Sequence, residues 1–225
     1  MSGVPSNRQL RVHVLHAMPT GNLGTVAAQR SLFKLLIENN FDVSVSTPNP
    51  EVFKRIHPEA GNMKVYRSLT PLSDIAERFV SRYIQWGIVT ILRLLIFTFM
   101  APFLRLGFSY PSIKDAVERV RNCDILLDLN LELFRGVPIS VSPRLIKQKP
   151  RVLLIHKVFW SIRILQYLWL LVLIKSIFKK KLAIGPASFG PFDDLPTLVK
   201  WLVKIVLNRF VDLIFVRESL TLRSY

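Results

Sequence analysis

The stretch that decides the fold runs from Arg11 to Thr47 and reads RVHVLHAMPTGNLGTVAAQRSLFKLLIENNFDVSVST. It contains a short apolar strand, a turn with two glycines, a segment with helical periodicity, and a second apolar strand. Pro48 and Pro50, just after this stretch, are expected to end the second strand and break the regular structure. The helical segment carries apolar residues at the spacing of one buried face: Ala28, Leu32, Leu35 and Leu36. It stops at Asn39-Asn40, which tolerate a left-handed cap. A strand, glycine turn, helix and strand in this order predict the start of a parallel sheet.

The rest of the chain continues the alternation of strands and helices. We expect further strands at 123–129, 151–156, from 182 into a glycine and proline turn, and 211–218. We expect helices at 72–108 with a break at Ala101-Pro102, at 112–122, at 158–181 and at 195–210, and a loop at 57–71. The sequence therefore predicts one α/β domain over residues 1–225, a Rossmann-like parallel sheet with helices on both faces.

Composition excludes several classes of protein. The chain has 225 residues, of which 50% are hydrophobic and 20% charged, which excludes a disordered tail, a collagen and a coiled coil. A single cysteine, Cys123, excludes a disulfide framework and a cysteine-rich zinc site, and we expect it to be a core thiol. No His-x-x-x-His occurs, so no metal pair of that kind is expected on a helix.

The net charge of +16 is concentrated in two windows. Residues 78–114 hold five basic and no acidic residues, and residues 133–192 hold eleven basic and no acidic residues. Both windows are also the most apolar parts of the chain. Positive charge on apolar segments predicts contact with an anionic membrane surface rather than with nucleic acid, whose usual binding signatures are not visible.

The most apolar helices, around 73–108 and 158–181, leave three readings open. A spanning helix needs about 20 apolar residues, and the run at 83–104 is broken by Arg93. These helices are therefore read as buried on one side with lipid on the other, as plain core helices, or as a membrane span. Their aromatic residues suit either a core or a membrane interface: Tyr83, Trp86, Trp160, Tyr167 and Trp169.

Three short motifs follow predicted strands, at the sheet edge where parallel sheets bind ligands. GNLG supplies Gly21, Asn22 and Gly24, and helix-end amides beside such glycines bind anions. ASFGPF supplies Ser188 and Gly190, and VRE supplies Arg217, whose guanidinium suits phosphate or carboxylate. The alternative for GNLG is a plain tight turn. The alternatives for Arg217 are a salt bridge with Glu218 and a plain surface charge.

Two histidines form a second tier of candidates. His16 and His156 each end a predicted strand, where each faces the cleft or serves a structural role.

Taken together, GN-x-G, S-x-GPF, V-R-E-S and the acidic strand CDILLDLN resemble the polysaccharide pyruvyl transferase family, in order and over nearly the whole chain. The resemblance implies the N-terminal half of a two-domain transferase of the GT-B type. It implies transfer of a pyruvyl group from phosphoenolpyruvate to a cell-envelope saccharide, free or lipid-linked, to form a ketal. No metal or redox cofactor is expected.

The resemblance also predicts where the protein is located in the cell and whether part of the enzyme is missing. With the basic apolar helices, it suggests a cytoplasmic protein at the periphery of the inner membrane face. A helix opened at Ser219 has seven residues left, 219–225, so we expect a fragment or one half of a split enzyme whose C-terminal domain is absent or separately encoded.

Two departures from the family pattern favour other readings. Thr25 stands where members usually have Asp after GN-x-G, and Leu131 and Glu132 stand where they usually have a glycine pair, or Gly and Asp, after the acidic strand. They favour a non-catalytic, diverged membrane-peripheral protein of the same fold. Half of a GT-B type glycosyltransferase is the third hypothesis, on analogy of fold alone.

Overall fold

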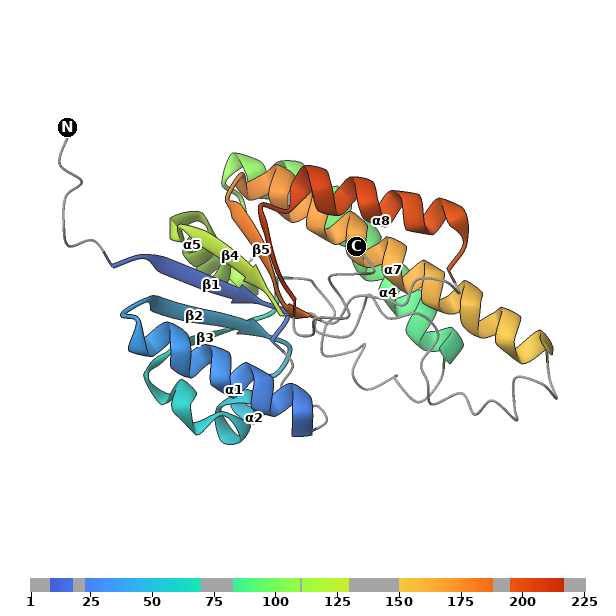
Figure 1. Ribbon diagram of the computed structural model, residues 1–225. Helices are drawn as coiled ribbons and strands as arrows, with labels where there is room; N and C mark the ends of the chain where they lie inside the picture. Colours follow the sequence, from blue (N-terminus) through green and yellow to red (C-terminus); the bar gives the residue numbers. More distant parts are fainter. Residues whose placement is uncertain are drawn as a thin grey trace, which may run out of the picture.

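Six parallel strands form one sheet in the order β3-β2-β1-β4-β5-β6 (Figure 1). The structure is a computed structural model that describes residues 9–17, 23–69, 83–109, 111–129, 150–187 and 195–216. The strands are β1 Arg11–Leu15, β2 Asp42–Thr47, β3 Lys64–Arg67, β4 Ile125–Asp128, β5 Lys181–Ala187 and β6 Leu213–Val216. The expected α/β, Rossmann-like fold class is confirmed, whereas the likeness to a GT-B half stays a prediction.

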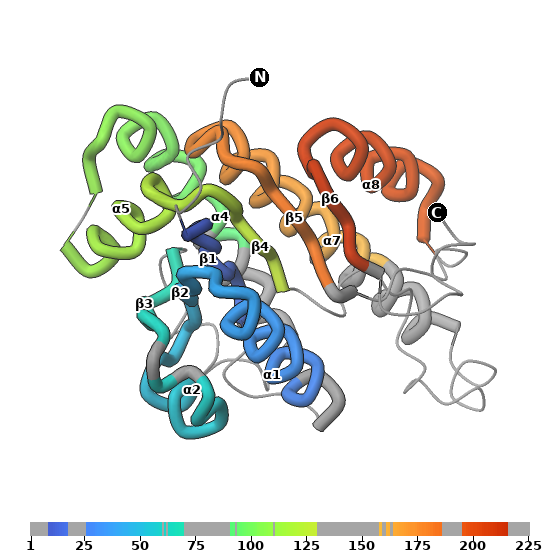
Figure 2. Tube along the Cα trace, turned by 60° about the vertical axis from the view of Figure 1, so that its left-hand side comes forward, coloured from blue at the N-terminus to red at the C-terminus, as the bar shows by residue number. Residues whose placement is uncertain are grey.

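Helices cover both faces of this sheet (Figure 2). One face carries α1 Leu23–Glu38 and α2 Pro50–Ile56, and the short helix η1 Pro58–Asn62 follows α2. The other face carries α4 Tyr83–Leu106, α5 Lys114–Asn122, α7 Pro150–Phe178 and α8 Thr197–Phe210, with η2 Pro111–Ile113 leading into α5. Alternate residues of each strand point to opposite faces, so Val12 and Val14 join the core under α1 while Leu15 joins the core under α4 and α7.

The end of α1 follows the sequence prediction. Asn40 takes a φ of +59°, the left-handed conformation expected of a helix cap. The Phe41 amide donates to the Leu36 carbonyl at 3.0 Å and the Asn40 amide to the Ile37 carbonyl at 2.9 Å. This closes the helix and directs the chain into β2.

The predicted strand at 151–156 is wrong, because these residues belong to α7. Pro150 occupies the first position of this helix, where its fixed φ and missing amide hydrogen cost nothing. No glycine or proline follows within α7 to break it. A short apolar run fits a strand and a buried helix equally well, and here the uninterrupted length decides for the helix.

The predicted break at Ala101-Pro102 is also wrong. α4 continues through Pro102 to Leu106, with Phe97 and Leu104 buried on either side of the proline. The turn lies instead at Gly107, whose φ of +108° suits glycine. The predicted loop at 57–71 contains η1 and β3, and α2 was not expected because Pro50 was read as a breaker although it begins a helix capped by Asn49.

Among the described helices, none is by itself long and apolar enough to cross a membrane. One bent pair, Leu94–Leu106 with Pro111–Asn122, reaches that length and composition together. Its second half buries Ala116, Val117 and Val120 in the core of the domain.

A buried histidine lies at the centre of the sheet beneath α5. The His13 side chain is fully buried, with Nδ1 at 2.8 Å from Ser44 Oγ and Nε2 at 2.8 Å from Ser46 Oγ. The Arg119 guanidinium donates to Ser44 Oγ at 2.9 Å and pairs with Asp42 at 2.6 Å. Burial, helped by the charge of Arg119, lowers the pKa of His13 to about 3. The imidazole is therefore neutral and fully used by the fold.

We expect acid to destabilise the protein through His13. The unfolded chain takes up a proton near pH 6.5, whereas folded His13 stays neutral to about pH 3. The unfolded state therefore binds more protons as the pH falls. The stabilisation is complete above about pH 6.5 and is lost by up to about 1.4 kcal/mol per pH unit below it. Urea unfolding at several pH values from about 7 to 4 measures this slope.

His13→Gln is the matched variant, because glutamine can bond both serines but cannot take up the proton. We expect its free energy of unfolding to depend less on pH, by about one proton. His57, whose pKa burial also lowers, is present in both proteins and cancels in the comparison. Equal slopes in the two proteins would show that His13 is not the group that titrates.

Candidate functional site

The carboxyl ends of the six parallel strands meet at one edge of the sheet. The chain runs from β1 outward to β3 and then returns to add β4 on the other side of β1. β1 and β4 are therefore neighbours, but the next described helix after β1 is α1 on one face, whereas the next after β4 is α7 on the other. Folds of this class bind ligands at such a switch point, beyond the carboxyl ends of the strands.

His16 directly follows β1 at this switch point. Its φ of +53° is unusual for a residue other than glycine, although histidine adopts it more readily than most. Nδ1 lies 3.2 Å from Oδ1 of Asp128, and 19% of the side chain is exposed. Since Nδ1 faces the carboxylate, Nε2 is the ring nitrogen left for a ligand.

Asp128 ends β4 and is completely buried. The paired register sets Leu15 opposite Asp128, which brings His16 alongside the carboxylate. The Tyr167 hydroxyl donates to Oδ2 at 2.5 Å from the inner face of α7. A buried carboxylate needs charge-assisted hydrogen bonds to replace water, and β1 and α7 each supply one.

Tyr167 is fixed as a hydrogen-bond donor. Burial, followed by the charge of Asp128 and the hydrogen bond to it, raises the pKa of this phenol well above its ordinary value of 10.0. The ring also lies edge-on to the His16 imidazole, with centroids 6.4 Å apart. We name His16, Asp128 and Tyr167 the switch-point cluster.

This arrangement suits proton transfer. A carboxylate that accepts from Nδ1–H fixes the imidazole tautomer and places the lone pair on Nε2. His16 thus has the surroundings of a general acid or base, while Asp128 and Tyr167 position it.

The structure describes some of the predicted site residues and not others. His16 is at the ligand edge, as expected. Gly24 is the second residue of α1, whose first amides are free of intrahelical partners. Gly21, Asn22, Ser188, Gly190 and Arg217 lie outside the described residues, as does Leu131.

His156 was expected to end a strand and face the cleft, and the strand position is wrong. It lies within α7, because residues 151–156 form the beginning of that helix rather than a strand.

Sequence reasoning missed Asp128 and Tyr167 as site residues. Asp128 carried a signal, because it ends an apolar strand where an unpaired carboxylate would be costly. Tyr167 was read as a core or membrane-interface ring, and the core reading is confirmed by its burial, while Trp169 is 45% exposed.

The described residues provide neither a metal site nor a reactive thiol. These residues contain no group of three or more His, Cys, Asp or Glu placed to hold a metal ion. Cys123 is buried, and its Sγ donates to the Val120 carbonyl at 3.0 Å. Burial raises the pKa of this thiol to about 11, so the prediction of a core thiol is confirmed.

No protein-family model matches this chain, and no curated protein matches it.

We expect Tyr167→Phe to lower the free energy of unfolding by about 1–3 kcal/mol, because a buried carboxylate loses a hydrogen-bond donor. We also expect the free energy of unfolding of the native protein to fall in alkali because of Tyr167. The unfolded chain loses the tyrosine proton above about pH 10 while folded Tyr167 keeps it, so stability falls as the pH rises. Urea unfolding at about pH 7 and pH 10.5 measures both effects.

Tyr66→Phe is the control, because Tyr66 is a half-buried tyrosine on β3. We expect it to change stability by less than about 1 kcal/mol. A Tyr167→Phe protein as stable as the native one would show that the hydroxyl is not needed to hold Asp128.

Proposed function

We propose that this chain is the donor-binding part of a transferase that moves a pyruvyl group from phosphoenolpyruvate to a cell-envelope saccharide. The observation that carries the proposal is the switch-point cluster, in which a partly exposed His16 is held by a fully buried Asp128. It provides an acid–base group at the edge where a doubly wound sheet binds ligands. The order of the motifs along the sequence supports the same choice.

We assign binding of the anionic donor to residues that follow β1, β5 and β6 in the sequence. Gly21 and Asn22 come between β1 and α1, Gly24 is the second residue of α1, and amides at the start of a helix bind phosphate. Ser188 and Gly190 follow β5, and Arg217 directly follows β6. We assign Arg217 to the carboxylate or phosphate of phosphoenolpyruvate, since a guanidinium forms paired hydrogen bonds with either group.

The proposed reaction balances without a redox cofactor or a metal. Two saccharide oxygens bond to C2 of the enolpyruvyl group, and the bond from C2 to the phosphate oxygen breaks. One hydroxyl proton ends on C3, which becomes a methyl group, and the other leaves with the phosphate. His16 is the residue we assign to these proton transfers, through Nε2.

The place and partners of the enzyme are part of the proposal. A saccharide or lipid-linked saccharide acceptor would be met at the cytoplasmic face of the inner membrane, where the protein is peripheral. A second Rossmann-like half, separately encoded or part of a longer chain, would close the cleft, as the resemblance implies.

A second candidate is a non-catalytic membrane-peripheral protein of the same fold. It is favoured by the exposed apolar face of α4, where Phe99 is 81% exposed, and by Thr25 and Leu131, which depart from the family pattern. Half of a nucleotide-sugar glycosyltransferase is the remaining alternative. Donor binding distinguishes the three.

We expect calorimetric titration to show binding of phosphoenolpyruvate in preference to pyruvate and UDP. Arg217→Ala should weaken this binding by about tenfold or more, because one paired guanidinium contact to an anion is lost. His16→Asn should also weaken it, while asparagine keeps the left-handed backbone at this position. Urea unfolding checks that both variants remain folded.

Lys34→Ala serves as the control, because Lys34 is an exposed cation on α1 paired only with Glu38 among the described residues. We expect it to bind phosphoenolpyruvate like the native protein. Unchanged affinity in Arg217→Ala would overturn the assignment of that residue. Selective binding of UDP would favour the glycosyltransferase half, and no binding by the folded chain would favour the non-catalytic protein.

A further inference from the structure

The outer face of α4 carries a line of exposed apolar side chains. Phe99 is 81% exposed and Leu106 is 75% exposed. With their neighbours at helical spacing they form what we call the α4 stripe: Leu92, Leu95, Phe99, Phe103 and Leu106. Large apolar side chains gathered in one stripe mark an interaction surface, whereas scattered ones do not.

The α4 stripe is not needed to hold α4 on the domain. Phe97 and Leu104 point from the opposite side of the helix and are 1% exposed in the core shared with α7. Positions 97 and 99 are about 200° apart around a helix, so the two sets face opposite ways. α4 therefore has a buried inner face and a second apolar face turned away from the core.

Two further helices extend this surface. α4, α7 and α8 lie side by side over one face of the sheet, with α7 packed against both of the others (Figure 1). Trp169 on α7 is 45% exposed, and its Nε1 donates to Thr98 Oγ1 at 2.9 Å, which fixes the indole against α4. On α8, Leu198 is 65% exposed and Trp201 is 57% exposed. We call these three helices the outer helical layer.

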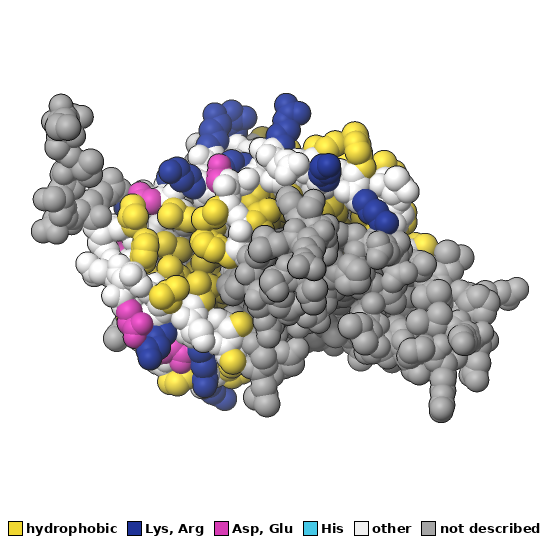
Figure 3. Space-filling view, viewed as in Figure 1, with side chains coloured by type: hydrophobic (Ala, Val, Ile, Leu, Met, Phe, Trp, Pro, Cys, Tyr) yellow, Lys and Arg dark blue, Asp and Glu magenta, His cyan; other side chains and the backbone are white. Residues whose placement is uncertain are grey.

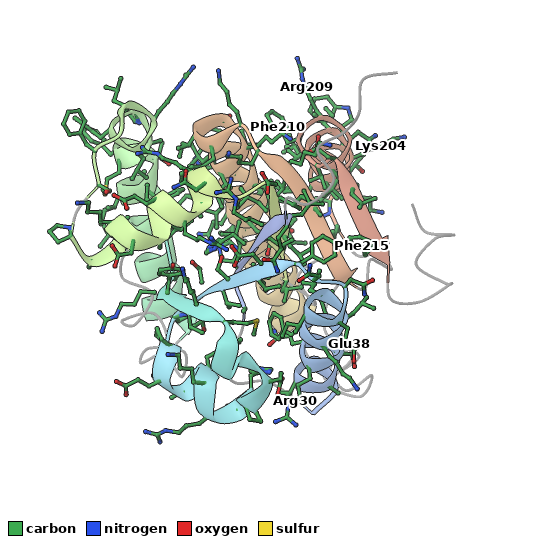
Figure 4. All side chains as sticks on the ribbon, turned by 90° about the vertical axis from the view of Figure 1, so that its left-hand side faces the viewer. Arg30, Glu38, Lys204, Arg209, Phe210 and Phe215 are labelled. Carbon is green, nitrogen blue, oxygen red and sulfur yellow. The ribbon has the colours of Figure 1, made fainter. Side chains whose placement is uncertain are left out.

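The charge of the outer helical layer has one sign. Together α4, α7 and α8 contain nine Lys and Arg and no Asp or Glu: Arg93, Arg105, Arg151, Lys157, Arg163, Lys175, Lys200, Lys204 and Arg209. On α8, Lys204 and Arg209 point outward (Figure 4), and basic and hydrophobic side chains lie next to each other over this helix (Figure 3). By contrast α1, α2 and α5 each mix acidic and basic residues.

We propose that the outer helical layer docks on an anionic lipid bilayer. The α4 stripe and Trp169 enter the boundary between headgroups and acyl chains, and the exposed cations Arg105, Lys204 and Arg209 contact headgroup phosphates. A second copy of the chain fits this surface poorly, because the excess of cations over acids on each layer would make two copies repel, even though Lys175 is paired with Asp212. The inference does not rest on the pyruvyl-transfer proposal, since other residues carry it.

The test is co-sedimentation of the full chain with vesicles. One set is phosphatidylcholine with about 30% phosphatidylglycerol, and the other is phosphatidylcholine alone. We expect binding to the anionic vesicles only, falling at least tenfold between about 0.05 and 0.5 M salt as the charges are screened. Phe99→Glu should reduce this binding at least tenfold, because it puts a carboxylate into the apolar stripe.

Leu35→Glu is the matched control. Leu35 is 57% exposed on α1, which covers the other face of the sheet, so the same charge change should leave vesicle binding unchanged. Both positions are exposed, and urea unfolding is expected to show stabilities close to that of the native protein. A charge variant, K204E together with R209E, should also bind anionic vesicles less.

Four results would overturn the proposal: no binding of the native chain to anionic vesicles, equal binding to neutral ones, indifference to salt, or equal losses in Phe99→Glu and Leu35→Glu. Self-association that Phe99→Glu abolishes, seen by sedimentation velocity without lipid, would assign the stripe to a contact between copies. Titration with phosphoenolpyruvate in the same variants keeps the two proposals separate, because vesicle binding can fail while donor binding is unchanged.

Discussion

The buried carboxylate of Asp128 is the constraint on which the centre of this structure depends. Asp128 ends β4 beside β1, and its side chain is fully buried. Its carboxylate accepts a hydrogen bond from the Tyr167 hydroxyl at 2.5 Å and lies 3.2 Å from Nδ1 of His16. A charge in such a place is stable only with donors close by. The need for donors therefore ties β1, β4 and α7 to one point, and that point is the switch point of the sheet. His16 accepts a left-handed backbone there, a cost of about 1–2 kcal/mol that the surrounding contacts must offset.

Much of the fold could be predicted because its signals are local. The stretch from Arg11 to Thr47 contains its own strands, helix and helix cap, and these lie close to where the sequence predicts. Where local signals are ambiguous the prediction failed. An apolar run such as 151–156 does not reveal whether it belongs to a strand, and the length of α7, fixed by packing between α4 and α8, decides. Pro50 and Pro102 were both read as breakers, yet one begins a helix and the other lies within one.

Only one member of the switch-point cluster could be predicted from the sequence. His16 could be placed at the sheet edge because it follows the first strand. Its partners come from positions 112 and 151 residues further along the chain, and neither the register of β1 with β4 nor the rotation of α7 can be read from periodicity alone. Buried polar groups show the same limit. His13 looks like one more strand residue, and only the structure reveals that Ser44 and Ser46 enclose it.

α7 connects the two surfaces to which we assign functions. Tyr167 and Trp169 are two positions apart, about 200° around the helix, and so point to opposite sides. The first holds the carboxylate at the sheet edge, and the second bonds Thr98 beside the α4 stripe. Because interiors are close-packed, a helix of this kind moves as a rigid body rather than bending around one residue. Contacts made on the outer helical layer and the position of the Tyr167 hydroxyl are thus fixed by the same element, which holds the apolar, basic face of the molecule and its polar sheet edge in one geometry.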